Sequence, residues 1–133
     1  MNSMPDVPDG FESGVMFDDE SLPLSVRIDE ALHMMQVAQR EAKGRGITLS
    51  RVTAEYYSSK AKETMALHEK GYPATLIANL IKGQPETNRL LETKLAEEAG
   101  YRNAVEAIQA FKLIARILND EEQRDWEQAR RTT

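Results

Sequence analysis

PETNRLLETKLAEEAGYRNAVEAIQAFKLIARIL, residues 85–118, is the stretch that decides the fold. Its apolar residues recur at alternating steps of three and four, which places them on one side of a helix. This spacing is typical of coiled-coil packing, in which a seam lies against a neighbouring helix. The seam consists of Tyr101, Ala104, Ile108, Phe111, Ala115 and Leu118. The pattern predicts one long helix that begins at Pro85, ends near Leu118 and packs lengthwise against another helix.

Three shorter helices are predicted before this long one. Residues 24–43 carry an apolar stripe, and we expect Gly44 and Gly46 to end that helix. Residues 48–70 form a second helix. A short apolar helix at about 74–82 follows, between a Gly-Tyr-Pro break and a Gly-Gln-Pro break that interrupt helical backbone on either side.

The fold class expected from these elements is all-α. Residues 48–70 and 85–118 are the arms of an antiparallel helical hairpin, with the short helix at its turn and an additional N-terminal helix alongside. No run alternates as a strand does, and no internal repeat is visible. The predicted domains are a disordered acidic N-terminal tail, residues 1–22, and a helical domain, residues 23–133. Because so small a helical core is marginal alone, we also expect a homo-oligomer.

The charge is distributed unevenly. The chain has 22 acidic and 17 basic residues, and residues 1–20 hold six of the acids with no Lys or Arg, so the remainder has 16 acids against 17 bases. The acidity therefore belongs to the tail, and a nearly neutral body does not exclude contact with phosphate groups.

Several classes of function are disfavoured by what the sequence lacks. The absence of cysteine excludes disulfides, thiolate nucleophiles and Cys-based metal sites. The two histidines, His33 and His68, stand in no metal-binding spacing, and the adjacent Glu97 and Glu98 point in different directions on a helix. We therefore predict a protein that is not an enzyme and has no cofactor and no metal. No apolar run is long enough to span a membrane and no signal peptide is visible, so we expect a cytoplasmic protein.

Basic side chains form one candidate binding surface. They are Lys60, Lys62, Lys82, Arg102, Lys112 and Arg116. Arg102, Lys112 and Arg116 share a broad face of the long helix, and such a row is able to follow a phosphate backbone. The alternative is an ordinary solvated face, with Glu106 relieving the repulsion between its cations.

The turn of the hairpin is the second candidate surface. It holds the apolar and aromatic cluster Tyr72, Pro73, Leu76, Ile77, Leu80 and Ile81. Such a cluster marks a partner-binding tip if exposed, whereas the alternative is burial against the first helix or a second copy. A DNA-binding helix-turn-helix around Gly83 fits less well, because Asn79, Arg89 and Glu92 occupy positions that this motif fills with apolar residues.

Residues 56–126 resemble a family of small uncharacterised phage and prophage proteins of Gram-positive bacteria. The resemblance lies in a Tyr-Tyr and Lys-Ala-Lys opening, a Gly-x-Pro-Ala-Thr-Leu-Ile turn, a Lys-Gly pair, an Ala-Glu and Tyr segment, and a closing Lys-x-x-x-Arg-x-Leu. Here these are Tyr56, Tyr57, Lys60, Ala61 and Lys62; Gly71, Pro73, Ala74, Thr75, Leu76 and Ile77; Lys82 and Gly83; Ala96, Glu97 and Tyr101; and Lys112, Arg116 and Leu118. The resemblance implies a setting, the DNA metabolism of a phage, and no mechanism.

Our leading hypothesis is thus a non-enzymatic accessory protein of phage DNA replication or recombination that contacts single-stranded DNA or a replication protein. The alternative is an inhibitor of a host nuclease or defence complex, in which the acidic tail imitates phosphate charge. A purely structural hairpin of the secreted kind with Trp in its turn is disfavoured, because the only tryptophan, Trp126, lies near the C-terminus.

Overall fold

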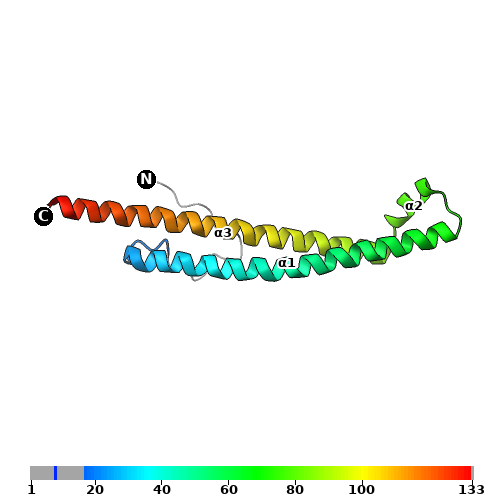
Figure 1. The fold of residues 1–133 in the computed structure, drawn as a ribbon, viewed down its shortest axis with the longest axis horizontal. Coiled ribbons are helices and arrows are strands. Elements are labelled where there is room, and N and C mark those ends of the chain that lie inside the picture. Colours follow the sequence, from blue (N-terminus) through cyan, green and yellow to red (C-terminus); the bar gives the residue numbers. More distant parts are fainter. Residues whose placement is uncertain (1–7, 9–16, 133) are drawn as a thin grey trace. The chain divides into compact units, whose positions relative to one another are not determined.

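The computed structural model describes Pro8 and residues 17–132, and this part of the chain forms three helices and no strand (Figure 1). Helix α1 spans Leu24–Glu69, α2 spans Ala74–Ile81 and α3 spans Pro85–Thr132. Two long helices connected through a short one make an all-α helical hairpin, which confirms the predicted fold class.

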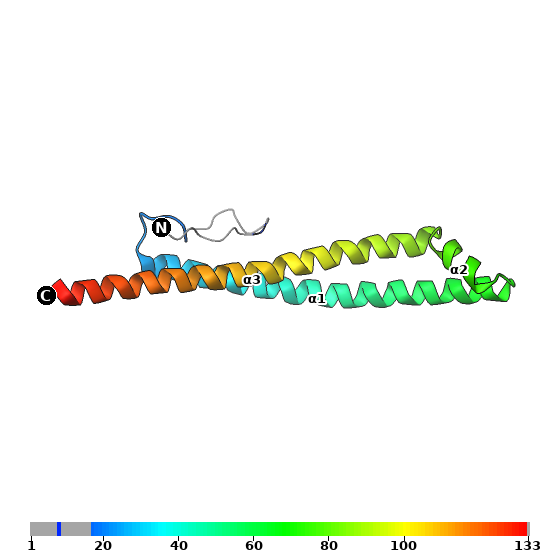
Figure 2. The same cartoon turned by 90° about the horizontal axis from the view of Figure 1, so that it is seen from above.

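The chain divides into two compact units. One comprises Met1–Ala42 and Arg102–Thr133 and is called here the core unit; the other, Lys43–Tyr101, is called the tip unit. Each unit contains a part of α1 and a part of α3, which lie side by side (Figures 1 and 2). The two parts are antiparallel in the tip unit, since the earlier α1 residue Arg45 meets Glu97 whereas the later Ser59 meets Thr87.

The core unit is held together by apolar side chains of α1 and α3. Phe111, Ile114 and Leu118 are fully buried, and the small Ala31 and Ala38 on α1 allow the helices to approach closely. The predicted seam is confirmed from Ala104 to Leu118 and is widened by further buried residues. Coiled-coil spacing therefore does produce the lengthwise packing expected of it.

An aromatic residue ahead of α1 completes this core. Phe17 is buried, its ring meets that of Phe111 edge-on at 5.8 Å between centroids, and its carbonyl accepts a 2.7 Å hydrogen bond from Nε of the buried Arg27. The predicted disorder of residues 1–22 concerns chiefly residues 1–7 and 9–16, which lie outside the described part. Residues 17–22 form turns in which the Ser21 hydroxyl donates to Asp19.

The expected break at Gly44 and Gly46 was wrong, because α1 passes through both glycines as one helix of 46 residues. No separate N-terminal helix therefore exists. An interior glycine costs only about 1 kcal/mol relative to alanine, which packing along the helix easily offsets. Gly46 has a packing role as well: a Cβ built there would lie 3.4 Å from the Tyr101 ring, so glycine leaves room for that ring.

The expected end of the long helix near Leu118 was also wrong, since α3 continues to Thr132. Residues 119–132 contain neither glycine nor proline, and opposite charges such as Glu127 and Arg131 stand four residues apart. Such pairs support an exposed helix without tertiary contacts. Polarity alone did not end this helix.

The connections around α2 follow the predicted chemistry. Gly71 has φ +88°, the left-handed conformation that favours glycine. The amide of Tyr72 donates to the Leu67 carbonyl and that of Gly71 to the His68 carbonyl, which closes α1 with a Schellman motif. Pro85 then opens α3, where a missing amide hydrogen costs nothing.

Candidate functional site

Helix α2 packs against the end of α1 within the tip unit. Ile77 and Ile81 are buried together with Leu67, and Leu80 packs partly against them. Apolar residues at positions i and i+4 give α2 one buried face, and this is why so short a helix is held in place. The small cluster fixes the position of α2 relative to the last turns of α1.

The predicted partner-binding tip is split between the inside and the outside of the tip unit. Ile77, Ile81 and in part Leu80 face α1. Tyr72 and Leu76 are each 41% exposed, and Pro73 is exposed beside them. One face of the cluster is therefore buried against Leu67, which belongs to the predicted 48–70 helix and not to the first helix, and the other face is exposed to solvent. Partner binding by the exposed face stays a prediction.

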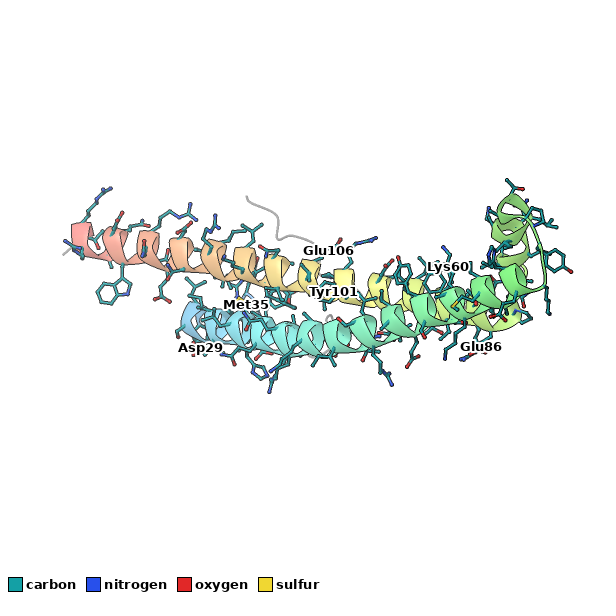
Figure 3. The ribbon with its side chains drawn as sticks, turned by 45° about the vertical axis from the view of Figure 1, so that its right-hand side comes forward. Asp29, Met35, Lys60, Glu86, Tyr101 and Glu106 are labelled. Atoms are coloured by element: carbon teal, nitrogen blue, oxygen red, sulfur yellow. The ribbon has the colours of Figure 1, made fainter. Side chains whose placement is uncertain are left out.

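A groove lies between α2 and the end of α1. It has a volume of about 550 Å³ and a largely apolar lining. Its α1 wall is formed by Lys60, Thr64, Met65, His68 and Glu69, and its α2 wall by Ala74, Ile77, Ala78 and Ile81. Figure 3 labels Lys60 on the side of α1 from which α2 rises. A space of this size is within the range of sites that take a small molecule or several side chains of a partner.

Charged groups stand at the two ends of the α1 wall. Lys60 comes first and Glu69 last, and nine residues of helix separate them by roughly 14 Å. Met65 between them is 65% exposed. Nine residues are two and a half turns of helix, so Lys60 and Glu69 border the groove from opposite sides of α1. The groove is thus largely apolar and is bordered by one positive and one negative charge.

Elsewhere in the tip unit, a polar contact fixes the register of α1 against α3. Thr87 is only 2% exposed, and its hydroxyl donates to Glu63 Oε2 at 2.7 Å. Because a hydroxyl has a single hydrogen, the 2.9 Å contact with Ser59 must be donated by the Ser59 hydroxyl. The chain Ser59 to Thr87 to Glu63 satisfies every member and specifies one alignment of the two helices.

Besides the pair Arg45–Glu97 between α1 and α3, two ion pairs of the tip unit lie within α3 itself. Arg89 donates two hydrogen bonds to Glu86, labelled in Figure 3, and these lower the pKa of the Glu86 carboxyl and raise that of Arg89. Lys94 donates to Glu98 at 2.7 Å, which raises the pKa of Lys94. Contacts of this kind between residues of one helix contribute little to the stability of the fold and support that helix locally.

The six predicted basic residues are all exposed, three in each unit. In the tip unit, Lys60 lines the groove, Lys82 follows α2, and Lys62 lines a separate depression that Glu55 and Glu86 also line. Two carboxylates beside Lys62 weaken its attraction for an anion.

The other three, Arg102, Lys112 and Arg116, lie in the core unit on α3. Glu106, labelled in Figure 3, stands among them on the same helix. This set keeps the helical spacing on which the basic surface was predicted.

Sequence reasoning missed most of the α1 wall of the groove. It selected Lys60 for its charge and passed over Thr64, Met65 and His68. Their spacing matches one helix face immediately before the Gly71 break, so extending the tip cluster backwards along α1 would have found them.

Within the described part of the chain, no three His, Asp or Glu side chains gather closely enough to hold a metal ion. None of the helices seen there combines the length and the apolar character that crossing a bilayer demands. Comparison with protein-family models, with curated proteins and with solved structures gave no match.

Proposed function

We propose that this chain is a non-enzymatic accessory binding protein of phage DNA replication or recombination, acting in the host cytoplasm. Its groove between α1 and α2 docks a helical segment of a replication or recombination protein. The observation that carries this proposal is the largely apolar groove of about 550 Å³, which Lys60 and Glu69 also line. The setting comes from the resemblance of residues 56–126 to small phage proteins.

A helix suits this groove because two helices already form its walls. An amphipathic helix laid between them buries an apolar face at residues i, i+3, i+4 and i+7 and keeps its polar face in water. Ala74 and Ala78 on the α2 wall leave room for a closely approaching backbone. The flexible thioether of Met65 adapts to the side chains that enter.

The test is a titration of the full chain with purified replication and recombination proteins of the phage that encodes it, followed by calorimetry. Ala78→Glu places a charge in the groove and is expected to weaken binding about tenfold or more. Asn79→Glu is the matched control, since Asn79 is exposed on the same helix and does not line the groove. Equal affinities for the two variants, or no binding partner among these proteins, would contradict the proposal.

Single-stranded DNA is the second candidate partner, favoured by the exposed Arg102, Lys112 and Arg116 on one face of α3. Gel shifts of a labelled oligonucleotide at several salt concentrations measure this. Replacing all three residues by Gln should reduce the magnitude of the salt slope by about 2, since each phosphate contact contributes about 0.7. No shift at micromolar protein excludes direct DNA binding and leaves protein docking as the function.

A further inference from the structure

Within the tip unit, the side of α1 that faces away from α3 carries a second regular series of residues. Steps of three and four alternate without interruption through Ile47, Ser50, Ala54, Tyr57, Ala61, Thr64 and His68. Residues at these steps share one side of a helix. All of them are exposed except Thr64, which is half-buried. This series is called here the outer seam.

The outer seam lies opposite the contact with α3 and is free of charge. Two residues turn a helix by about 200°, and Val52 and Ser59, two positions before Ala54 and Ala61, are buried or bonded to α3. Residues 47–68 contain five Asp, Glu, Lys or Arg side chains, and none of them falls on the outer seam. Charged residues are depleted at the centre of protein interfaces, whereas solvated helix faces are rich in them. The outer seam therefore has the composition of an interface.

The spacing of the outer seam is complementary to itself. Tyr57 is the middle residue of the series, so an antiparallel second copy of α1 centred on Tyr57 presents the same steps from the other end. Tyr57 then meets Tyr57 of the second copy, Ala54 meets Ala61, and Ser50 meets Thr64. The small residues on both sides of Tyr57 allow two helices to approach closely, and the two half-exposed Tyr57 rings cover each other.

The two ends of the outer seam differ in shape, and each fits the other. At its N-terminal end stands Ile47, which is 64% exposed and lies ten residues before Tyr57. At its C-terminal end, eleven residues after Tyr57, His68 lines the groove between α1 and α2. The two ends are about 15 and 17 Å from Tyr57 along the helix. The antiparallel arrangement therefore brings Ile47 of one copy level with the groove of the other, which favours a second copy over an unrelated helix as the occupant.

We infer that two copies of this chain associate through their outer seams, antiparallel and centred on Tyr57, with Ile47 of each copy entering the groove of the other. Each groove thereby gains an apolar side chain beside Met65 and Ile77 that the chain does not supply to its own groove. The contact is one helix wide and about 32 Å long. This places it at the small end of stable interfaces, so we expect the dimer to dissociate in the micromolar range.

Self-association of this kind also regulates the function proposed above. The groove that receives Ile47 is the groove proposed to dock a partner helix, so the second copy and the partner compete for it. The dimer rests on the outer seam and does not depend on the identity of that partner.

The first test is sedimentation of the full chain over a micromolar concentration series, in which the mass should rise from monomer to dimer. Ala54→Glu should weaken the dimer about tenfold or more, because it places an unpaired carboxylate against Ala61 of the second copy. Ala66→Glu is the matched control, an exposed alanine of α1 that lies off the outer seam. Ile47→Ser should weaken the dimer about tenfold as well, since each dimer contains the contact of Ile47 with the groove twice. A chain that stays monomeric, or equal dissociation constants for Ala54→Glu and Ala66→Glu, would overturn the inference.

Introduced cysteines test the direction of the two helices, because the sequence contains no cysteine of its own. A mixture of Ser50→Cys chains and Thr64→Cys chains should form a disulfide-linked dimer when oxidised with copper phenanthroline, since the two positions face each other. Either variant alone should not, because its two cysteines would lie roughly 21 Å apart along the helices, whereas a disulfide joins Cα atoms no more than about 7 Å apart. A disulfide between two Ser50→Cys chains, or none in the mixture, would contradict the antiparallel arrangement.

Folding and the partner proposal are controlled separately. Ala54 and Ala66 are both exposed, so circular dichroism should show unchanged helix content in their variants. Ala54 does not line the groove, so Ala54→Glu should lose the dimer and still bind the phage partner protein. A chain that dimerises but finds no partner refutes the proposed function alone, and a chain that binds its partner but stays monomeric refutes the dimer alone.

Discussion

Replacing Phe111 by Ala should lower the unfolding free energy more than any substitution on the surface of α3. The Phe111 ring is fully buried, and it meets the buried Phe17 ring edge-on at 5.8 Å with an interplanar angle of 78°. Phe17 precedes α1 by seven residues, so this contact holds residues 17–23 against the seam of α3. The substitution removes the packing of Phe111 in the seam and its ring contact with Phe17.

The magnitude is set by the cavity and by the lost ring contact. Truncation of a buried Phe to Ala costs about 3–5 kcal/mol of unfolding free energy. The edge-on contact contributes about 0.5–1.5 kcal/mol beyond area burial. We expect the upper part of the range for Phe111→Ala, and a coupling of about 1 kcal/mol between Phe111→Ala and Phe17→Ala in a double-mutant cycle.

Urea unfolding followed by circular dichroism measures these values. Leu113→Ala is the control, two residues away on the same helix and 40% exposed, with an expected cost of about 1 kcal/mol or less. If Phe111→Ala cost no more than Leu113→Ala, the seam would not be the core. A coupling of zero between Phe111→Ala and Phe17→Ala would show that Phe17 does not belong to the core.

Four further outcomes are expected. Gly44→Ala should raise the unfolding free energy by about 0.5–1 kcal/mol, because a Cβ there meets no atom within 4 Å and alanine loses less backbone entropy than glycine when α1 forms. Thermal unfolding measures this change, and a lower melting temperature in the variant would mean that α1 breaks at residue 44. Gly71→Ala should cost about 1–2 kcal/mol, because φ is +88°; an unchanged melting temperature would contradict the left-handed cap. Thr87→Val should lower the unfolding free energy by about 1–3 kcal/mol, because it leaves the polar partners Ser59 and Glu63 without their hydrogen bonds to Thr87. Urea unfolding measures this value, and a gain in stability would show that these hydrogen bonds do not form. Hydrogen bonds from Arg89 lower the pKa of Glu86, so this pair stabilises the fold above the ordinary glutamate pKa, and that contribution is lost as the pH falls through the lowered pKa of the folded state. NMR titration should show a higher Glu86 pKa in Arg89→Gln than in the unchanged protein. Equal Glu86 pKa values in the two proteins would show that Arg89 does not interact with Glu86.

Local chemistry made much of the hairpin predictable. The seam of α3 follows from steps of three and four between apolar residues, a pattern typical of lengthwise packing against another helix. Gly71 and Pro73 end one helix and begin another through their own backbone preferences, which operate whatever surrounds them. These features gave the all-α class, the antiparallel arms and the short helix α2.

The helix ends that prediction missed show the limit of local preference. Gly44 and Gly46 weaken a helix by an amount comparable with one or two tertiary contacts, so packing decides whether α1 continues. Tyr101, distant in sequence, lies against Gly46 in the structure. The glycines in the sequence do not by themselves predict that contact with Tyr101.

Periodicity and turn chemistry in the sequence by themselves determined an all-helical hairpin, its seam and the position of its turn. Only the tertiary structure decided that α1 is continuous, that Phe17 joins the core and that α2 leaves a groove beside Met65 and Ile77. The physical reason is that helix and turn preferences act between near neighbours in the chain. Burial and grooves depend on which distant side chains meet, and that is a property of the packed chain.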